Sequence, residues 1–378
     1  ELQIRLPSIK KTIVFDSTFD SWNLNSNYWI DFELESVKFD HPIWVLFSSG
    51  TTGKPKAITH GTGGILLEQY KSHSLHQNIM NDDRFFWNTT TGWMMWNYAL
   101  GSFLCGATLC LYDGSANFPD IGVQWRFAKE AKINHFGNGS PLFIASMKQN
   151  SKDVNNKNLK FIKTIGATGS PLSIEAFKWL QKKLPSTQII SLSGGTDVCS
   201  AFIGGCPKLP VYAGFLQCNM LGASIQAWDE NGKSIKGKTG ELVITEPLPS
   251  MPVFFWGDEN FEKYNDSYFS ENQEVWTHGD WIFIDELRGV LMQGRSDATL
   301  NRNGIRIGTS EIYSVLDGIK EIKDSLIIDL NIGSSSKLIL FLESEHELNK
   351  GFRSNIIKAI KSKCSPRHTP NLIFSISQ

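Results

Sequence analysis

The sequence predicts an α/β protein with a large domain of mostly parallel sheets with helices plus an antiparallel β region, followed by a small α+β C-terminal domain. Between about residues 41 and 200, short apolar segments end in small or glycine-rich residues and alternate with helix-length segments. From about 210 to 295, turn residues between alternating apolar residues indicate antiparallel hairpins. After Asp297 the pattern changes to a short hairpin followed by helices and strands. The 378 residues suffice for two domains, which we place at 1–297 and 298–378.

The first region contains four candidate strands with their carboxyl ends in small residues. They are IWVLFSS at 43–49, TLCLYDG at 108–114, FIKTIGATG at 161–169 and QIISLSGG at 188–195. A parallel sheet places its functional loops at such ends. The uncharged stretch 85–112 has the length of a membrane span. Polar residues dilute it and Gly101 and Gly106 divide it, so we expect a buried helix followed by a strand.

The later elements follow from turn residues and apolar alternation. Antiparallel strands are expected in ASIQAWDENGKSI (223–235), GELVITEP (240–247) and DWIFIDELRGVLMQG (280–294), with turns at Asn231-Gly232 and Arg288-Gly289. The C-terminal region predicts a hairpin at 298–308, a helix at about 309–318, strands SLIIDL and KLILFLES, and a helix ending near Cys364.

Charge and composition argue against several kinds of partner. The 37 Lys and Arg residues balance 38 Asp and Glu residues, so no basic field is available for nucleic acid or an anionic membrane. A local phosphate site remains open. The first dozen residues contain no apolar segment of a signal peptide, and the six cysteines show no CxxC pair or zinc spacing. These features predict a cytoplasmic protein with reduced thiols.

The strongest chemical signal is SSGTTGKPK, which directly follows the apolar segment IWVLF. Glycine lets backbone N–H groups turn toward an anion, while hydroxyls add donors and lysines add charge. A Walker A loop is excluded, because Ser48 stands where that motif needs glycine and Pro55 follows the lysine. We expect a phosphate loop, and an ordinary Ser/Thr/Gly turn is the alternative. Its residues are Ser48, Ser49, Gly50, Thr51, Thr52 and Gly53, with charge from Lys54 and Lys56.

This loop resembles the phosphate signature of the adenylate-forming superfamily of acyl-CoA synthetases, peptide-synthetase adenylation domains and luciferases. Three further segments resemble its motifs in the same order: SGGTD (193–197) for adenine and magnesium, HGD (278–280) for ribose, and GRSDATLNRNGIRIGTSEIY (294–313) for the hinge. TTGWMMWN, LYDGS, SGGTD and LPVYAG are most similar to the acetoacetyl-CoA synthetase branch. The resemblance, from about residue 41 to the end, implies an AMP-forming acid–CoA ligase that uses acetoacetate, ATP, coenzyme A and Mg²⁺.

The resemblance also implies roles for the residues around the nucleotide. Asp280 would accept both ribose hydroxyls, and Arg295 would lie on the ribose and phosphate side. Arg306 would meet the phosphate, and the Gly304 loop would approach the thiol. Considered without the family, Asp280 could cap a turn and Arg295 could be a surface cation.

Two shorter segments complete the expected nucleotide site. The Thr196 hydroxyl would meet the α-phosphate, and Asp197 would hold Mg²⁺. Asp197 is one methylene shorter than the glutamate of the family, so a water-bridged contact would serve. Gly169, Ser170 and Pro171 resemble the adenine loop with serine in place of glutamate, and a plain β-turn is the alternative. Gly194 and Gly195 precede Thr196 in the adenine motif.

The acyl pocket is expected to accept an acid longer than acetate. In acetyl-CoA synthetases a tryptophan closes this pocket, and the matching position here is Gly194. The cavity is expected to be lined by Trp93, Met94, Met95 and Thr168. Core packing of a buried helix is the alternative for these residues. Thr168 or Asn97 is the expected donor to the 3-keto oxygen of the acid.

Compared with the family, the sequence lacks the N-terminal part of the large domain and ends before the catalytic lysine. It begins with Glu1, and the resemblance therefore predicts an incomplete ligase whose small domain rotates about Asp297. A non-catalytic adenylate-binding remnant and a ligase for another short or branched acid are the alternative functions. His60, His73 and His76 lack metal-binding spacing and are expected to be structural.

Overall fold

The chain divides into two units, residues 1–37 and 38–378. The computed structural model describes residues 34–48, 55–272, 274–287, 289–296, 300–302, 305–307, 309–332, 335–344 and 346–376. All elements named below belong to the second unit. The domain boundary expected at Asp297 stays a prediction, because residues 297–299 lie outside the described part.

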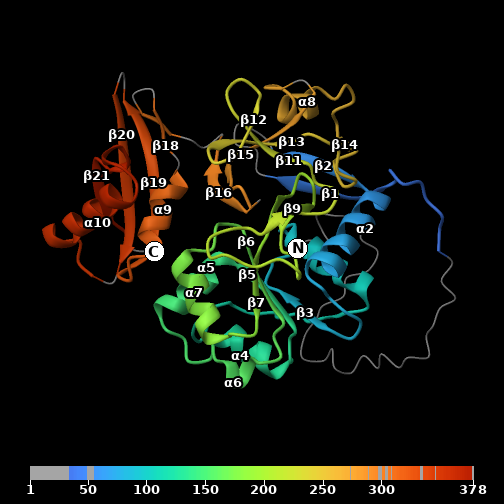
Figure 1. Ribbon diagram of the computed structural model, residues 1–378, viewed down its shortest axis with the longest axis horizontal. Helices are drawn as coiled ribbons and strands as arrows, with labels where there is room; N and C mark the ends of the chain where they lie inside the picture. Colours follow the sequence, from blue (N-terminus) through green and yellow to red (C-terminus); the bar gives the residue numbers. More distant parts are fainter. Residues whose placement is uncertain are drawn as a thin grey trace, which may run out of the picture. The chain divides into compact units, whose positions relative to one another are not determined.

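A five-stranded parallel sheet forms the centre of the region up to residue 191. Its strands are β3 (Arg84–Trp87), β4 (Thr108–Leu109), β5 (His135–Gly139), β6 (Thr164–Thr168) and β7 (Gln188–Ser191). They are arranged in the order β4-β3-β5-β6-β7 (Figure 1). Three of the four segments expected to form parallel strands contribute to this sheet, with adjacent pairs in parallel register.

Both faces of the parallel sheet are covered, as alternation along β3 shows. Phe86 belongs to one hydrophobic cluster, while Phe85 and Trp87 belong to another on the opposite face. The first cluster includes residues of α4 (Val123–Glu130), α5 (Ser140–Lys148), α6 (Asn156–Leu159) and α7 (Ile174–Lys183). The second includes residues of α2 (Thr62–Lys71) and α3 (Met95–Leu100). A Cβ atom on Gly137 would lie 2.0 Å from the Trp87 ring, so glycine at this position of β5 leaves room for the ring to lie over that strand.

The prediction that IWVLFSS joins the parallel sheet is wrong. Strand β1 (Pro42–Ser48) pairs antiparallel with β2 (Lys56–Gly61), which also pairs with β14 (Phe254–Phe255). A connection of only seven residues allows a hairpin but not a crossover to a parallel neighbour. The hairpin places Ser48 opposite Lys56, at the two ends of the expected phosphate loop.

The uncharged stretch folds as expected into short elements within the protein. Its residues contribute to β3, α3, the 3₁₀ helix η3 (Gly101–Cys105) and β4. Within the described ranges, no helix is long and apolar enough to cross a membrane. The π-helical turn η2 (Ser72–His76) extends α2.

Antiparallel strands follow, as the hairpin signals predicted. Five of them form the sheet β12-β11-β13-β15-β16. Their bounds are Ile225–Trp228 for β11, Ser234–Ile235 for β12, Thr239–Ile244 for β13, Trp276–Ile284 for β15 and Val290–Arg295 for β16. A small sheet contains β8 (Ser193–Gly195), β9 (Ser200–Gly204) and β10 (Cys218–Asn219), and helix α8 (Glu262–Tyr268) precedes β15.

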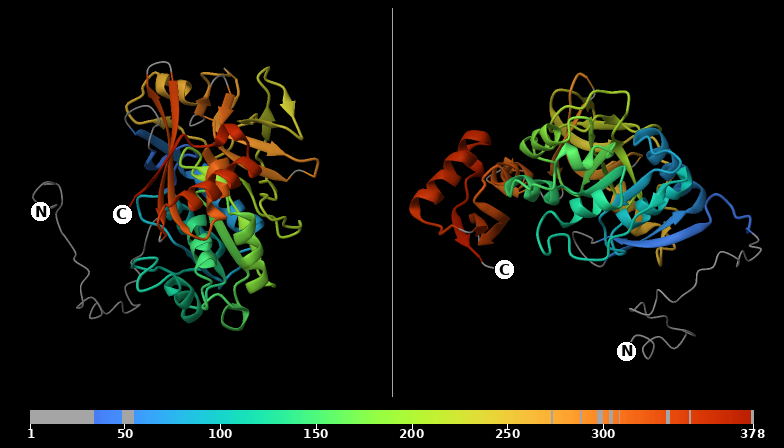
Figure 2. Two further views of the ribbon diagram at one scale, coloured as in Figure 1. Left: turned by 90° about the vertical axis from the view of Figure 1, so that its left-hand side faces the viewer. Right: turned by 90° about the horizontal axis from the view of Figure 1, so that it is seen from below.

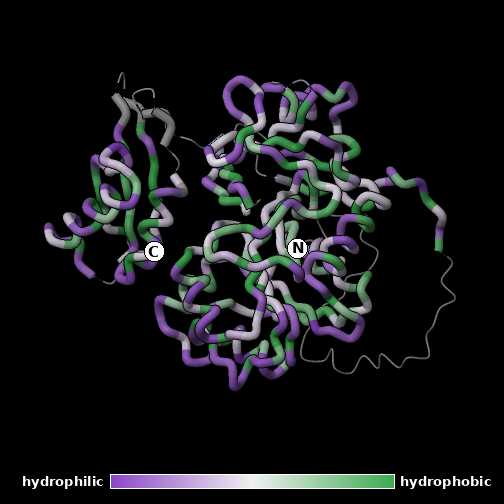
Figure 3. Tube along the Cα trace, in the orientation of Figure 1, coloured by the Kyte–Doolittle hydropathy of each residue, from purple (hydrophilic) through white to green (hydrophobic). Residues whose placement is uncertain are grey.

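The C-terminal elements have a hydrophobic cluster of their own, with residues between Ile312 and Ile373. They are β17 (Leu300–Arg302), β18 (Ile305–Ile307), α9 (Thr309–Asp317), β19 (Ile322–Ile332), β20 (Ser335–Ser344), α10 (Lys350–Lys363), η4 (Pro366–His368) and β21 (Leu372–Ser375). Figure 2 shows α10 beside the sheet β19-β20-β21. In Figure 3 hydrophobic residues follow the strands of this region. The predicted elements are confirmed here, whereas η4 and β21 were not expected.

Candidate active site

A tight turn between β8 and β9 holds Thr196 and Asp197. The amide of Cys199 donates to the Thr196 carbonyl at 3.2 Å, which closes the turn. Lys56, at the start of β2, reaches this turn and places its Nζ atom 2.7 Å from Oδ1 of Asp197. The expected phosphate and magnesium motifs therefore meet, although 141 residues separate the two side chains in sequence.

Further groups surround Asp197, whose side chain is only 18% exposed. The Tyr268 hydroxyl donates to Oδ1, and Nε2 of His60 donates to the Asp197 carbonyl at 2.9 Å. Burial alone would raise the pKa of Asp197, but Lys56, His278 and Tyr268 outweigh it and hold that pKa below its usual value. The carboxylate is thus kept ionised.

The expected ribose motif lies beside this turn. A Cβ atom on Gly195 would lie 3.5 Å from the His278 ring and 3.7 Å from Oδ2 of Asp197. The Trp276 indole donates to Nδ1 of His278 at 3.2 Å, and Nε2 of His278 lies 3.7 Å from Oδ2 of Asp280. Burial lowers the pKa of His278, so its neutral form, with the proton on Nε2, faces Asp280.

Asp280 and Arg295 stand opposite each other on the hairpin of β15 and β16. Their side chains approach to 3.9 Å between Nη1 and Oδ2, with Arg295 47% exposed and Asp280 13% exposed. The structure therefore brings together two residues that the sequence assigned to the ribose. Strand β16 is the edge strand of this sheet, and Arg295 is its last residue.

Glu241 is a neighbour that the sequence analysis did not identify. Its Oε1 accepts hydrogen bonds from the Gly279 amide at 3.1 Å and from the Ser296 hydroxyl at 2.9 Å. Burial, together with the nearby Glu271 and Asp280 carboxylates, raises the pKa of Glu241 to about 7. Glu241 lies in the apolar segment GELVITEP, where its residue type indicates only an outward-facing strand position.

Only the two ends of the expected phosphate loop lie within the residues that the structure describes. Ser48 has a buried hydroxyl without a hydrogen-bond partner in the described part, which leaves a donor at the start of the loop. Ser49, Gly50, Thr51, Thr52, Gly53 and Lys54 lie outside the described residues. Arg306 pairs through its backbone strand with Asn301, but its side chain and Gly304 also lie outside the described part.

The adenine-loop residues lie near the aromatic side chain expected in the acyl pocket. A Cβ atom on Gly169 would lie 3.7 Å from the Trp93 ring, and the Ser140 hydroxyl donates to the Ser170 carbonyl at 2.6 Å. Thr168 donates its hydroxyl to the Leu192 carbonyl at 2.8 Å. Pro171 and Ser170 line the same cavity as Trp93.

Met94 and Met95 instead belong to a core cluster, where they are 9% and 4% exposed. This environment agrees with the core-packing alternative for the two methionines. Their neighbours in the cluster include Trp87 and Tyr98. Neither methionine is among the residues that line the large cavity described next.

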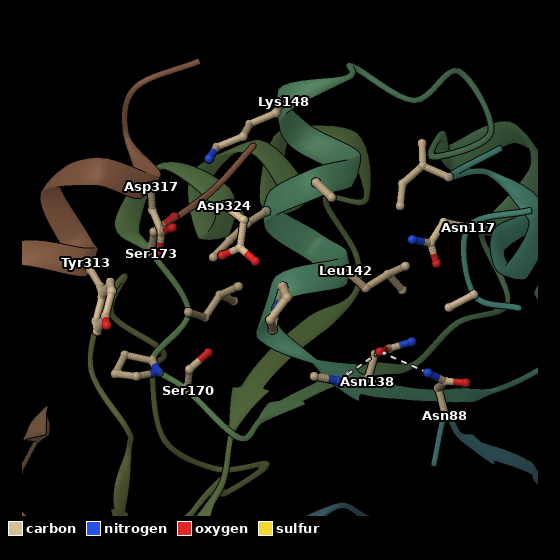
Figure 4. A pocket seen from close by; sticks show the side chains of 18 of the residues that line it. Asn88, Asn117, Asn138, Leu142, Lys148, Ser170, Ser173, Tyr313, Asp317 and Asp324 are labelled. Atoms are coloured by element: carbon tan, nitrogen blue, oxygen red, sulfur yellow. Dashed lines mark hydrogen bonds between the residues drawn. The ribbon is translucent and has the colours of Figure 1, made fainter. Parts of the chain in front are cut away.

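The cavity has a volume of about 2340 Å³ and polar amide side chains along part of its wall (Figure 4). Gln124 donates to Oδ1 of Asn88 at 2.7 Å, and Asn138 donates to Oε1 of Gln124 at 2.8 Å. Asn88 follows β3 and Asn138 is the second-last residue of β5, so both lie at the carboxyl edge of the parallel sheet. No motif in the sequence signals this amide network, because it joins isolated residues from three elements.

Gly194 lies in β8, close to the backbone of the neighbouring strand β9. A Cβ atom there would lie 1.9 Å from the Ser200 carbonyl oxygen and 2.7 Å from Cα of Ala201. Gly194 therefore faces the backbone of β9, which needs the close approach. The absence of a side chain at this position serves the β8–β9 pairing, and the expectation that it enlarges the acyl pocket stays a prediction.

The three histidines expected to be structural are buried. His73 bonds through Nδ1 to the Gln69 carbonyl, and burial lowers its pKa to about 4. His76 bonds through Nδ1 to the Gly205 carbonyl and accepts from the Leu221 amide through Nε2. Among the described residues, no group of three or more His, Cys, Asp or Glu could hold a metal ion.

Known proteins match the chain in both sequence and fold. The acetoacetyl-CoA synthetase of Gallus gallus is 39% identical over 98% of this chain and 59% of its own length. The solved acetoacetyl-CoA synthetase from Streptomyces lividans has a TM-score of 0.83 and 42% identity, over 90% of this chain and 53% of that one. The chain thus spans little more than half the length of these relatives.

A more distant structure shares the fold alone. The anthranilate CoA ligase AuaEII, solved in complex with anthranoyl-AMP, has a TM-score of 0.79 and 20% identity, covering 92% of this chain and 66% of that one. The family model described as AMP-binding enzyme matches residues 3–251, which is more than half of the chain. The phosphate-loop hairpin and the Asp197 turn both lie within the matched residues. The chain therefore belongs to the AMP-binding enzyme family.

Proposed function

We propose that the chain is the nucleotide-binding part of an ATP-dependent acid–CoA ligase that activates acetoacetate. The observation that carries this proposal concerns Lys56, Asp197 and Asp280: Lys56 contacts Asp197, and His278 lies beside the Asp197 turn and 3.7 Å from Asp280. These residues supply a cation for phosphate, a carboxylate for a metal and a carboxylate for ribose. Relatives named acetoacetyl-CoA synthetase, at about 40% identity, support the choice of acid.

The proposed chemistry has two steps. The acetoacetate carboxylate attacks the α-phosphorus of ATP, and the bond to pyrophosphate breaks to give the acyl-adenylate. The thiol of coenzyme A then attacks the acyl carbon, and AMP leaves. The first nucleophile is already ionised, so the protein needs no nucleophilic side chain and acts mainly by positioning and charge stabilisation. Lys56, Thr196 and Arg306 are the proposed groups near the phosphate.

The donor set around Asp197 fits a magnesium ion carried by the nucleotide. Mg²⁺ usually binds one or two carboxylates and completes its octahedron with water and substrate phosphate. Asp197 is ionised, and its Oδ2 has no hydrogen bond to another described residue. Mg²⁺ bound there would offset the charge that repels the acid from the phosphate. Asp197 would hold it, and the Thr196 hydroxyl would lie beside it.

We also propose two domains, 1–297 and 298–378, with rotation about Asp297 between the two steps. The separate hydrophobic cluster of the C-terminal elements supports this division. Rotation would exchange the groups next to the acyl-adenylate and bring the Gly304 loop toward the thiol. All six cysteines are free, which supports a reducing compartment such as the cytoplasm.

Of the two candidate donors to the 3-keto oxygen, we retain Asn97. The Thr168 hydroxyl already donates to Leu192, whereas the Asn97 side chain has no hydrogen bond to another described residue. A buried carbonyl without a donor costs about 1 to 3 kcal/mol, so a polar partner discriminates acetoacetate from butyrate.

Acid-dependent exchange of pyrophosphate into ATP tests the function in the full-length protein. We expect exchange with acetoacetate and markedly less with acetate or butyrate. If exchange is fastest with another short acid, the proposed reaction stands and that acid replaces acetoacetate as the proposed substrate. Binding of ATP without exchange for any acid would support the non-catalytic alternative.

A further inference from the structure

The two oxygens of the Asp197 carboxylate have different environments. Oδ1 accepts two hydrogen bonds, one from Nζ of Lys56 at 2.7 Å and one from the Tyr268 hydroxyl. Oδ2 accepts none from the residues that the structure describes, and it lies on the side of Gly195. One oxygen is therefore held by the protein, while the other is left for a ligand.

Packing on several sides holds Tyr268 in place. Tyr268 ends helix α8 and is 4% exposed. Its ring stacks on Trp276 with a centroid distance of 3.5 Å and an interplanar angle of 13°. Nζ of Lys56 lies 4.7 Å from the centre of the Tyr268 ring. The phenol hydroxyl is thus presented to Asp197 by a ring that has little freedom to turn away.

The two donors to Oδ1 differ in a way that matters for a cation. Lys56 carries a positive charge, which opposes binding of a second cation by the same carboxylate. Tyr268 is neutral, so it orients the carboxylate without that electrostatic cost. Groups that hydrogen-bond to a metal-binding carboxylate fix its direction and strongly affect metal affinity. Tyr268 has the burial, rigidity and contact that this role requires.

We propose that Tyr268 is a positioning residue for the metal-binding carboxylate: it holds Oδ1 of Asp197 so that Oδ2 faces the cation bound with ATP. This inference rests on the proposed function, since it assigns Mg²⁺·ATP to the Asp197 site. Tyr268 itself touches neither the nucleotide nor the cation. Its effect reaches them only through the direction of one carboxylate.

The decisive experiment compares Tyr268→Phe with Tyr264→Phe in the full-length protein. Tyr264 lies on the same helix and in the same aromatic cluster, with its ring 5.3 Å from that of Tyr268. Neither substitution removes a ring, so stacking is preserved and only a hydroxyl is lost. ATP binding is measured by calorimetry over a series of Mg²⁺ concentrations and again with chelator, and Mn²⁺ binding is followed by electron paramagnetic resonance.

For Tyr268→Phe we expect the apparent affinity for Mg²⁺ or Mn²⁺ in the presence of ATP to fall about 10-fold. ATP affinity in chelator should stay within about twofold of the unmodified protein, because the nucleotide does not contact Tyr268. Tyr264→Phe should leave both affinities unchanged. If the two variants show the same metal affinity, the inference is overturned while the proposed function stands.

A double-mutant cycle separates positioning from general stabilisation of the fold. Asp197→Asn should remove most of the metal dependence, and adding Tyr268→Phe to it should cause no further loss. An additional loss of equal size in the double variant would contradict action through Asp197. If the unmodified protein binds ATP with no response to Mg²⁺, the assignment of the metal to Asp197 fails first, and the role of Tyr268 fails with it.

Discussion

Nζ of Lys56 lies 2.7 Å from Oδ1 of Asp197, which links the end of the phosphate loop to the adenine motif. From sequence, the lysine is expected to bind phosphate and the aspartate to bind metal, and no contact between them is predicted. The ion pair places a positive group and a negative group of the same site within one hydrogen bond. Lys56 is thus held beside Asp197, and the proposed function requires it to meet an incoming phosphate from the same position on β2.

Replacing Lys56 by methionine should lower the rate of adenylate formation. A preorganised cation at developing phosphate charge contributes about 100-fold or more in rate. The same change leaves Asp197 with one donor fewer, which should raise the pKa of that carboxyl. Pyrophosphate exchange measures the rate, and Lys178→Met, a substitution of an exposed lysine, is the control. A full rate in Lys56→Met would move the role to another cation, such as Lys54.

Replacing Asp280 by alanine should weaken ATP binding. The carboxylate offers acceptors to ribose, and charged hydrogen bonds contribute about 1.5 to 3 kcal/mol, so the dissociation constant should rise roughly 10- to 100-fold. Calorimetric titration with ATP measures the change, and Glu230→Ala on an exposed turn provides the control. Equal affinities in the two variants would refute the ribose assignment.

Gly194→Trp should destabilise the protein without switching its substrate. The new side chain would start 1.9 Å from the Ser200 carbonyl oxygen, so the β8–β9 pairing must open. The melting temperature should fall by several degrees, as for a loss of about 2 kcal/mol or more. At Gly195, by comparison, a Cβ atom would meet only ordinary contacts at 3.5 Å, so Gly195→Ala should remain stable. Retained stability in Gly194→Trp, with a shift toward acetate, would instead support the prediction that Gly194 enlarges the acyl pocket.

Glu241 should make stability depend on pH near neutrality. Its pKa is raised from 4.5 to about 7, so the folded state binds the proton more tightly than the unfolded state. The free energy of unfolding should therefore decrease as the pH rises from about 4.5 through 7, by up to about 3 kcal/mol. Urea unfolding at several pH values measures this slope. Glu241→Gln should flatten it, and an unchanged slope would assign the titration elsewhere.

Asp83 should stabilise the parallel sheet at the edge opposite its functional loops. Its carboxylate accepts from Lys163 at 2.6 Å and contacts Nε2 of the buried His135 at 3.0 Å. Asp83→Ala leaves both groups without this partner and should cost about 3 kcal/mol in urea unfolding. Asp82→Asn, on the adjacent exposed residue, should cost little.

The pKa of Asp83 adds a pH signature to this prediction. Burial would raise that pKa, but hydrogen bonds from Lys163 and His135 hold it below the usual value. The stabilisation is therefore complete above the usual aspartate pKa and is lost as the pH falls through the lowered pKa. Asp83→Ala should lack this loss in acid. The same acid dependence in the variant would show that another carboxylate is responsible.

Local patterns determined much of the fold. Alternating apolar residues and turn signals predicted β11, β13, β15 and β16 and the C-terminal elements, because hairpins depend on neighbours in sequence. The segments at 164–168 and 188–191 were recognised as parallel strands by their apolar runs and small carboxyl ends. The motif residues Asp197 and Asp280 were found by resemblance, since each lies within a short continuous signature.

Tertiary structure alone decided which partners these residues meet. IWVLFSS has the composition of a buried parallel strand, yet its short connection to β2 makes it antiparallel. From sequence, Gly194 is expected to enlarge the acyl pocket. In the structure, the position where its side chain would start lies against the backbone of β9. Tyr268 and Glu241 carry no signal of their own, because a hydrogen bond to Asp197 or Gly279 depends on distances between residues far apart in the chain. Spacing along a chain predicts local geometry, whereas packing sets the contacts that orient a site.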